Sequence, residues 1–224
     1  MENTLPAFEA AAALDVAVQE FDVRQLRCGA LVCVHDEDFD RISDAAAVLG
    51  AGKPVRACTL DEVRRLDCGD GARVPTLEEA LAVMLPGSVP LIEHKGGDAD
   101  RYVEELQRLG VGDRVVLQSF DWRFLQRVAA LAPQLALGAL GPNPIYAEPD
   151  DEVLALLRGF GAEVLHWRAD ALTRRHVELA HAAGLLAFSY TTDEPEGWRR
   201  GRELGLDAMC TNDPAAMQDY MSGA

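Results

Sequence analysis

The chain has 224 residues with 37 acidic and 21 basic side chains, which gives a formal net charge of −16 at pH 7. This length fits one large domain or two small ones with a substantial core, and the ordinary apolar content argues against global disorder. The negative charge argues against nucleic acid and anionic membrane surfaces as partners. No apolar run reaches the ~18 residues that a membrane helix needs, and no signal peptide is visible. We therefore expect a cytoplasmic chain without stable membrane insertion.

Strand-like and helix-like segments alternate along the whole chain. Asn3 or Thr4 can cap a first helix that runs to about Leu14. Capping boxes begin at Thr59 and Thr76, and each opens a helix. Strands are expected at residues 17–24, 31–35, 89–93, 114–119, 135–140, 163–167, 186–190 and 207–210, and later helices at residues 99–109, 122–131, 151–158, 173–183, 196–204 and 214–221. This repetition predicts an α/β fold with a parallel sheet and helices outside it.

The number of strands points to an incomplete barrel. Without the strand at residues 31–35 there are seven strands of the repeating type, whereas a TIM-type (β/α) barrel closes with eight. We expect a gap between the strands at residues 17–24 and 207–210. Unpaired backbone groups at such a gap predict marginal stability and possible self-association at the open edge. The irregular stretch at residues 36–53 is long enough to be a functional loop beside a site.

Glu20 and Asp22 stand two residues apart on a predicted strand, so their side chains leave the same face. Such a pair is often only the solvated face of a strand, but the apolar neighbours here suggest a buried context. If residues 24–29 form a hairpin turn centred between residues 27 and 28, Glu20 lies opposite His35 and Asp22 lies opposite Cys33. A surface histidine beside Asp36 is the alternative interpretation of His35.

Glu93 ends the strand at residues 89–93, and Lys95 shares its face. A simple Glu–Lys ion pair at a strand end is the plain alternative. Three carboxylates without a soft ligand suit Mg²⁺ or Ca²⁺ better than Zn²⁺, and Lys95 could hold a phosphate oxygen. His166 is a further candidate for the barrel mouth, whereas His176 and His181 are expected to be structural.

Several short motifs follow one another in the order found in a known family: Glu2-Asn-Thr-Leu-Pro-Ala-Phe-Glu9, Glu20-Phe-Asp-Val-Arg24, Val34-His-Asp-Glu-Asp-Phe-Asp-Arg41, Thr59-Leu-Asp-Glu-Val63, Val74-Pro-Thr-Leu-Glu-Glu79, Ile92-Glu-His-Lys95, Gln118-Ser-Phe120 and Thr211-Asn-Asp-Pro214. Together they resemble the glycerophosphodiester phosphodiesterase family over essentially the whole chain. The resemblance implies a single TIM-type barrel domain over residues 1–224, with the strand at residues 31–35 as a family insertion.

The resemblance also implies residue roles. Glu20, Asp22 and Glu93 would bind a divalent cation, His35 would be a catalytic acid or base, and Lys95 would contact the phosphate. The small-molecule substrate would be a glycerophosphodiester, hydrolysed to glycerol 3-phosphate and an alcohol in lipid or glycerol phosphate metabolism.

The chain departs from the family at three places. The family begins with a strand ending in His-Arg-Gly that carries a second catalytic histidine and a phosphate-binding arginine, and the printed chain starts after that strand. Tyr190 stands where the family usually has Trp, and Asn212 replaces a usual Asp. A chain with one of two proton carriers is expected to be slow, because each carrier contributes ~10²–10⁴ in rate. The alternatives are a degenerate member that binds metal or phosphodiester without catalysis, and a related lipase of the phospholipase C or D kind.

Overall fold

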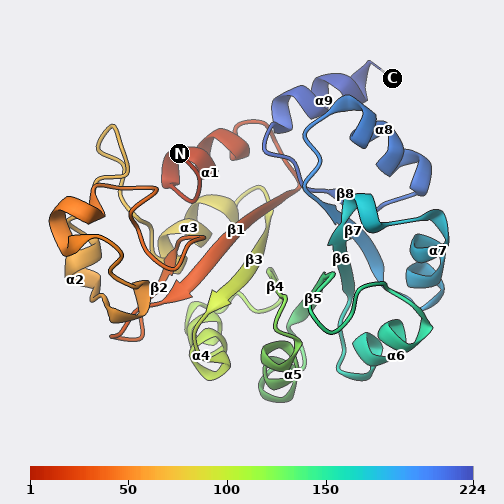
Figure 1. Ribbon diagram of the computed structural model, residues 1–224, viewed down its shortest axis with the longest axis horizontal. Helices are drawn as coiled ribbons and strands as arrows, with labels where there is room; N and C mark the ends of the chain where they lie inside the picture. The colour runs from red at the N-terminus through yellow and green to blue at the C-terminus, as the bar shows by residue number, and fades with distance from the viewer. Residues whose placement is uncertain (224) are drawn as a thin grey trace. The chain divides into compact units, whose positions relative to one another are not determined.

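The computed structural model describes residues 1–223, and the chain divides into two compact units, residues 1–117 and residues from 118 onward. Within residues 1–223, none of the helices is both long enough and apolar enough to cross a membrane. Figure 1 shows the strand–helix repeats of both units.

The first unit places two long parallel strands among helices (Figure 1). Its elements are α1 (Leu5–Ala12), β1 (Val18–Gln25), β2 (Leu31–Cys33), a π-helix (Ala46–Gly50), a 3-10 helix (Val55–Ala57), α2 (Leu60–Val63), α3 (Leu77–Met84), β3 (Val89–Gly96) and α4 (Ala99–Leu109). Both predicted capping boxes are confirmed, since Thr59 pairs with Glu62 and Thr76 pairs with Glu79 at the starts of α2 and α3. Strand β4 (Val116–Ser119) carries the boundary between the units.

The hairpin of β1 and β2 forms, but its predicted register is wrong by one residue. Val23 pairs with Cys33, and the Val34 N–H donates to the Asp22 carbonyl at 3.0 Å. The turn has three residues rather than two, because the Leu26 N–H bonds the Ala30 carbonyl and Gly29 takes a φ of +86°. One extra turn residue shifts every cross-strand partner, so Asp22 is not opposite Cys33 and Glu20 is not opposite His35.

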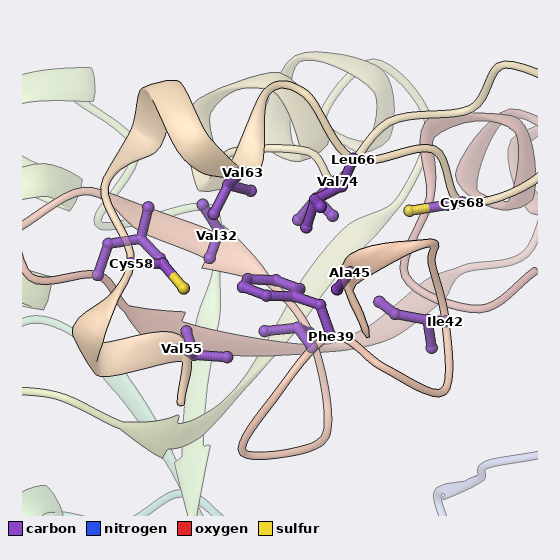
Figure 2. Close-up of a cluster of buried hydrophobic side chains, with 12 residues drawn as sticks. Val32, Phe39, Ile42, Ala45, Val55, Cys58, Val63, Leu66, Cys68 and Val74 are labelled. Atoms are coloured by element: carbon purple, nitrogen blue, oxygen red, sulfur yellow. The ribbon is translucent and has the colours of Figure 1, made fainter. Parts of the chain in front are cut away.

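The irregular stretch at residues 36–53 packs into a hydrophobic cluster that it shares with the β1–β2 hairpin and with residues 55–74. Phe39, Ile42 and Ala45 are buried with Val55 and Val63, which belong to the segments that follow. Figure 2 shows the ring of Phe39 among these aliphatic side chains. The stretch is therefore packed against the rest of the first unit through this shared cluster.

The second unit repeats the strand–helix pattern with parallel pairing of β5 to β6, β6 to β7 and β7 to β8. Its elements are α5 (Trp122–Leu131), β5 (Ala136–Gly141), α6 (Asp151–Gly159), β6 (Val164–Arg168), a 3-10 helix (Ala169–Ala171), α7 (Arg174–Ala182), β7 (Leu186–Tyr190), α8 (Pro195–Leu204), β8 (Ala208–Met209) and α9 (Pro214–Ser222). Asp121, Asp150, Thr173 and Asp213 cap four of these helices through their side chains.

The α/β class and the seven strands of the repeat, with β2 as an added hairpin strand, are confirmed over residues 1–223. Several strand ends differ from the prediction. Strand β2 stops at Cys33, so His35 lies beyond it, β3 continues past Glu93 to Gly96, and β8 has only two residues. The predicted gap between the first and last repeat strands stays a prediction.

Candidate metal and phosphodiester site

Three carboxylates from two adjacent parallel strands converge in the first unit. Asp22 pairs with Glu93 in the register of β1 and β3, and Glu20 precedes Asp22 on the same face. One carboxylate oxygen from each of the three residues lies within 4.8 Å of the others. Oxygens bound to one ion can lie at most about 5.2 Å apart, because the metal–oxygen bonds are no longer than about 2.6 Å. The side chains therefore stand close enough to share a single cation.

Lys95 lies against two of these carboxylates. Its Nζ is 2.6 Å from Glu93 Oε1 and 3.4 Å from Asp22 Oδ1. Burial raises the pKa of Glu93, and Lys95 partly opposes that rise. Burial acts to lower the pKa of Lys95, but the charges of Glu93 and Asp22 outweigh it and raise that pKa. The Glu93–Lys95 ion pair, which was the plain alternative from the sequence, is present, and it is part of the cluster of three carboxylates.

The donor set suits a hard divalent cation. Three carboxylates and one ammonium leave a formal charge of −2 (−3 from Glu20, Asp22 and Glu93, +1 from Lys95). Asp22 and Glu93 are buried and Glu20 is exposed, so two ligands are fixed by packing while one side stays accessible. Oxygen ligands of this kind are those that Mg²⁺ and Ca²⁺ prefer.

Asn3 positions Asp22, and this role of Asn3 was not predicted from the sequence. Its Nδ2 donates to Asp22 Oδ2 at 2.9 Å, and its Oδ1 accepts from the Asp22 N–H at 3.0 Å. Asn3 is buried and has a φ of +52°, a conformation that Asn tolerates better than most residues. Its place just before a helix favoured a capping role, but Thr4 occupies the cap position of α1. The positive φ leaves little trace in a sequence, so only the adjoining Glu2-Asn3 motif could have drawn attention to it.

His35 sits at the exposed end of a chain of charged side chains. Its Nδ1 lies 2.7 Å from Asp36 Oδ1, Asp36 Oδ2 accepts from Arg41 Nε at 2.5 Å, and Arg41 pairs with Glu2 at 2.6 Å. The hydrogen bonds from Arg41, and then the one with His35, lower the pKa of Asp36 to about 2. An ionised Asp36 only accepts, so Nδ1 of His35 donates to it, and Nε2 is left for a second partner.

The backbone of His35 is also held. Arg24 donates from Nε and Nη2 to the His35 carbonyl at 3.0 and 2.9 Å, and from Nη1 to the Lys95 carbonyl at 2.8 Å. The side chain of His35 is 50% exposed, so its ring is accessible from solvent. One arginine thus ties together the segments that carry the proposed proton carrier and the proposed phosphate contact.

His166, His181 and Tyr190 lie in the second unit, and each has a hydrogen-bond partner there. His166 is buried, with Nδ1 2.7 Å from Gln118 Oε1 and Nε2 3.6 Å from Cys210 Sγ. Burial lowers the pKa of His166 to about 4, which keeps it neutral near pH 7. His181 bonds Asp207 at 2.9 Å, and the Tyr190 hydroxyl donates to the Gly141 carbonyl at 2.8 Å.

A family model described as "Glycerophosphoryl diester phosphodiesterase family" matches residues 1–216. The chain belongs to this family of phosphoric diester hydrolases. The chain is 28% identical over 230 residues to a glycerophosphodiester phosphodiesterase of Caldanaerobacter subterraneus, covering 96% of this chain and 90% of that one. A glycerophosphodiester phosphodiesterase of Bacillus subtilis is 27% identical over 252 residues, covering 99% of this chain and 82% of its own length.

Solved structures show the same fold. A protein from Silicibacter pomeroyi superposes with a TM-score of 0.89 at 24% identity, covering 99% of this chain and 88% of that one. An Oleispira antarctica phosphodiesterase, solved with the product sn-glycerol-3-phosphate, superposes with a TM-score of 0.86 at 21% identity, covering 98% and 91%. The TIM-type fold predicted from the strand–helix repeat and the family resemblance is thereby confirmed.

Proposed function

We propose that this chain hydrolyses glycerophosphodiesters to glycerol 3-phosphate and an alcohol, with a divalent cation held by Glu20, Asp22 and Glu93. The observation that carries the proposal is the convergence of these three carboxylates with Lys95, within 4.8 Å for the carboxylate oxygens, in a chain that matches the family over residues 1–216. Mg²⁺ and Ca²⁺ are both compatible with the oxygen donors.

The bound cation would supply Lewis acidity at the phosphoryl group. Lys95 would hold a phosphate oxygen as a positive point charge, which requires it to share its ammonium with Glu93 and Asp22. Buried Asp22, fixed by Asn3, would keep the carboxylate group in one geometry as substrate binds.

His35 would move the proton. Because Nδ1 faces Asp36, the exchangeable position is Nε2, which can take a proton from the attacking hydroxyl or return one to the leaving alkoxide. Asp36 would stabilise the imidazolium form, and Arg41 would keep Asp36 ionised. The nucleophile is either water or the glycerol hydroxyl of the substrate itself. His166 is the second candidate if His35 does not carry the proton, although its burial argues against exchange with a ligand.

The direct experiment measures release of glycerol 3-phosphate from glycerophosphoethanolamine with Mg²⁺ or Ca²⁺, with EDTA, and with Glu93→Gln. We expect activity that needs the cation and is lost in the variant. Binding of cation and substrate without turnover would instead favour the non-catalytic alternative. Turnover unchanged by EDTA would refute the proposed role of the carboxylates.

We also propose three properties of the whole chain. The two units would form one barrel domain over residues 1–224, the chain would reside in the cytoplasm, and an open sheet edge would favour self-association. A single cooperative unfolding transition would support the first, and a concentration-dependent mass in sedimentation would support the last.

A further inference from the structure

A hollow of about 530 Å³ lies in the first unit beyond the ends of β1 and β3. Its wall comes from β1 and the hairpin turn, the 3-10 helix at residues 55–57, and the link from β3 to α4. The volume is in the range of small-molecule sites, which is about 300–1,000 Å³. Its charged lining consists of Arg24, Arg27, Arg56, Glu37 and Asp98.

Arg24 lines this hollow and also lies next to the cluster of three carboxylates. It stands two residues after Asp22 on the same strand face, and its guanidinium bonds the carbonyls of His35 and Lys95. Those bonds use one hydrogen from each of its three nitrogens, and a guanidinium has five N–H donors. The hollow therefore begins beside the residues proposed to handle the phosphodiester.

Arg27 and Arg56 have no hydrogen bond or ion pair from their side chains to any of residues 1–223, although both line the hollow. Six other arginines each pair with a carboxylate: Arg41, Arg64, Arg101, Arg108, Arg168 and Arg199. Other exposed arginines, such as Arg65 and Arg175, also lack a carboxylate partner among residues 1–223, but Arg27 and Arg56 line the same hollow. Unpaired guanidinium groups in a hollow are suited to bind a carboxylate or phosphate from a ligand.

The wall beside Arg24 is shaped by glycines. Gly97 has a φ of +121°, and a side chain there would lie 2.5 Å from Gln25 Cβ. The Gln25 amide oxygen accepts from the Asp98 N–H at 2.8 Å, which fixes the link from β3 to α4 against β1. The inner end of the hollow is thus formed by the backbone of residues 97 and 98 packed against the side chain of Gln25.

We propose that this hollow is a subsite for the alcohol part of the substrate and that it selects head groups carrying an anionic group. The proposal rests on the proposed hydrolysis of glycerophosphodiesters and names their class. Arg27 and Arg56 bind the carboxylate or phosphate of the head group. Glu37 and Asp98 in the same wall tolerate an ammonium group, so a zwitterionic head group that includes a carboxylate also fits.

Two substrates that differ by one carboxylate test the proposal. Glycerophosphoserine and glycerophosphoethanolamine both carry an ammonium group, and only the first has the carboxylate. We expect the wild-type chain with its cation to prefer glycerophosphoserine in kcat/KM by about tenfold, the size of one charge-assisted hydrogen bond. The double variant Arg27→Ala/Arg56→Ala should bring this ratio to about one. The control Arg65→Ala/Arg175→Ala removes the same charge from exposed arginines outside the hollow and should keep the preference.

Titration calorimetry in EDTA gives a second readout without turnover. Wild-type protein should bind glycerophosphoserine more tightly than glycerophosphoethanolamine, and the Arg27→Ala/Arg56→Ala variant should bind both equally. Hydrolysis of both substrates with equal kcat/KM would overturn the subsite and leave the proposed function standing. A preference that survives in that variant would also overturn it. If wild type hydrolyses neither substrate, the proposed function fails, and the calorimetric comparison then decides the subsite by itself.

Discussion

Polar side chains gather on the strands of both units, yet the two groups differ in charge and in exposure. In the first unit, Glu20, Asp22, Glu93 and Lys95 form a charged group with a formal excess of two negative charges and one exposed member. In the second unit, His166 is neutral, fully buried and in contact with Gln118 and Cys210. Both groups lie on strands of the repeat. Only the group in the first unit has an unbalanced, accessible charge, which suits it to bind a cation and a phosphodiester.

Loss of one carboxylate should have the largest effect. We expect Asp22→Asn or Glu93→Gln to lower kcat/KM by about 10⁴-fold, since cation assistance is worth several kcal/mol and each 1.36 kcal/mol is tenfold. The exposed Asp113, which makes no ion pair with any of residues 1–223, provides the matched control Asp113→Asn. Equal losses in both variants would mean that net charge rather than this group supports the activity.

Removal of the proton carrier should come next. His35→Ala is expected to lower the rate by ~10²–10⁴ while cation binding persists, because the hydrogen bond of its ring is to Asp36, which is not one of the three proposed ligands. Added imidazole should restore part of the rate in this variant. An unchanged rate would move the role of acid and base to another group, and the same substitution at His166 would then be the next to measure.

Asn3 offers a test of how the charged group is held. Asn3→Ala removes two hydrogen bonds from Asp22 and places Ala at a φ of +52°, so we expect a loss of about 3 kcal/mol in the free energy of unfolding. Asn3→Gly should lose less, because Gly adopts that φ without strain. Urea denaturation of both variants measures the difference, and equal losses would show that the backbone conformation at residue 3 is unstrained.

The buried His166 of the second unit should make the free energy of unfolding depend on pH. The folded-state pKa of His166 is lowered from 6.5 to about 4, so between these values the unfolded state binds more protons and stability falls as pH falls. From pH 7 to pH 5 we expect a loss of about 2 kcal/mol in the free energy of unfolding. His166→Phe should flatten this part of the profile. A wild-type profile that is already flat over this range would show that the pKa of His166 is not lowered in the folded chain.

The strand–helix repeat could be predicted from the sequence because helix starts and helical spacing are local sequence signals. The capping threonines Thr59 and Thr76 fixed two helix starts, and apolar residues at helical spacing located α4 and α5 to the residue. The proximity of Glu20 and Asp22 could be predicted because residues two apart on a strand share a face. Their approach to Glu93 depends on the parallel register of β1 with β3, which no local pattern encodes.

Other features of the first unit could not be predicted from the sequence because they depend on contacts between residues far apart in the chain or on the length of one turn. The hairpin register turned on whether the loop had two or three residues, and Gly29 allowed the longer one. The role of Asn3 required a contact nineteen residues away in the chain. The network from His35 through Asp36 and Arg41 to Glu2 likewise joins segments that only the folded first unit brings together.

The most direct test of the account is the binding of Mg²⁺ and Ca²⁺ to the chain by titration calorimetry, in the absence of substrate. We predict one cation per chain for wild type, and loss of that binding in Glu20→Gln, Asp22→Asn and Glu93→Gln but not in Asp113→Asn. Binding that persists in all three carboxylate variants would contradict the assignment of this group as the cation site.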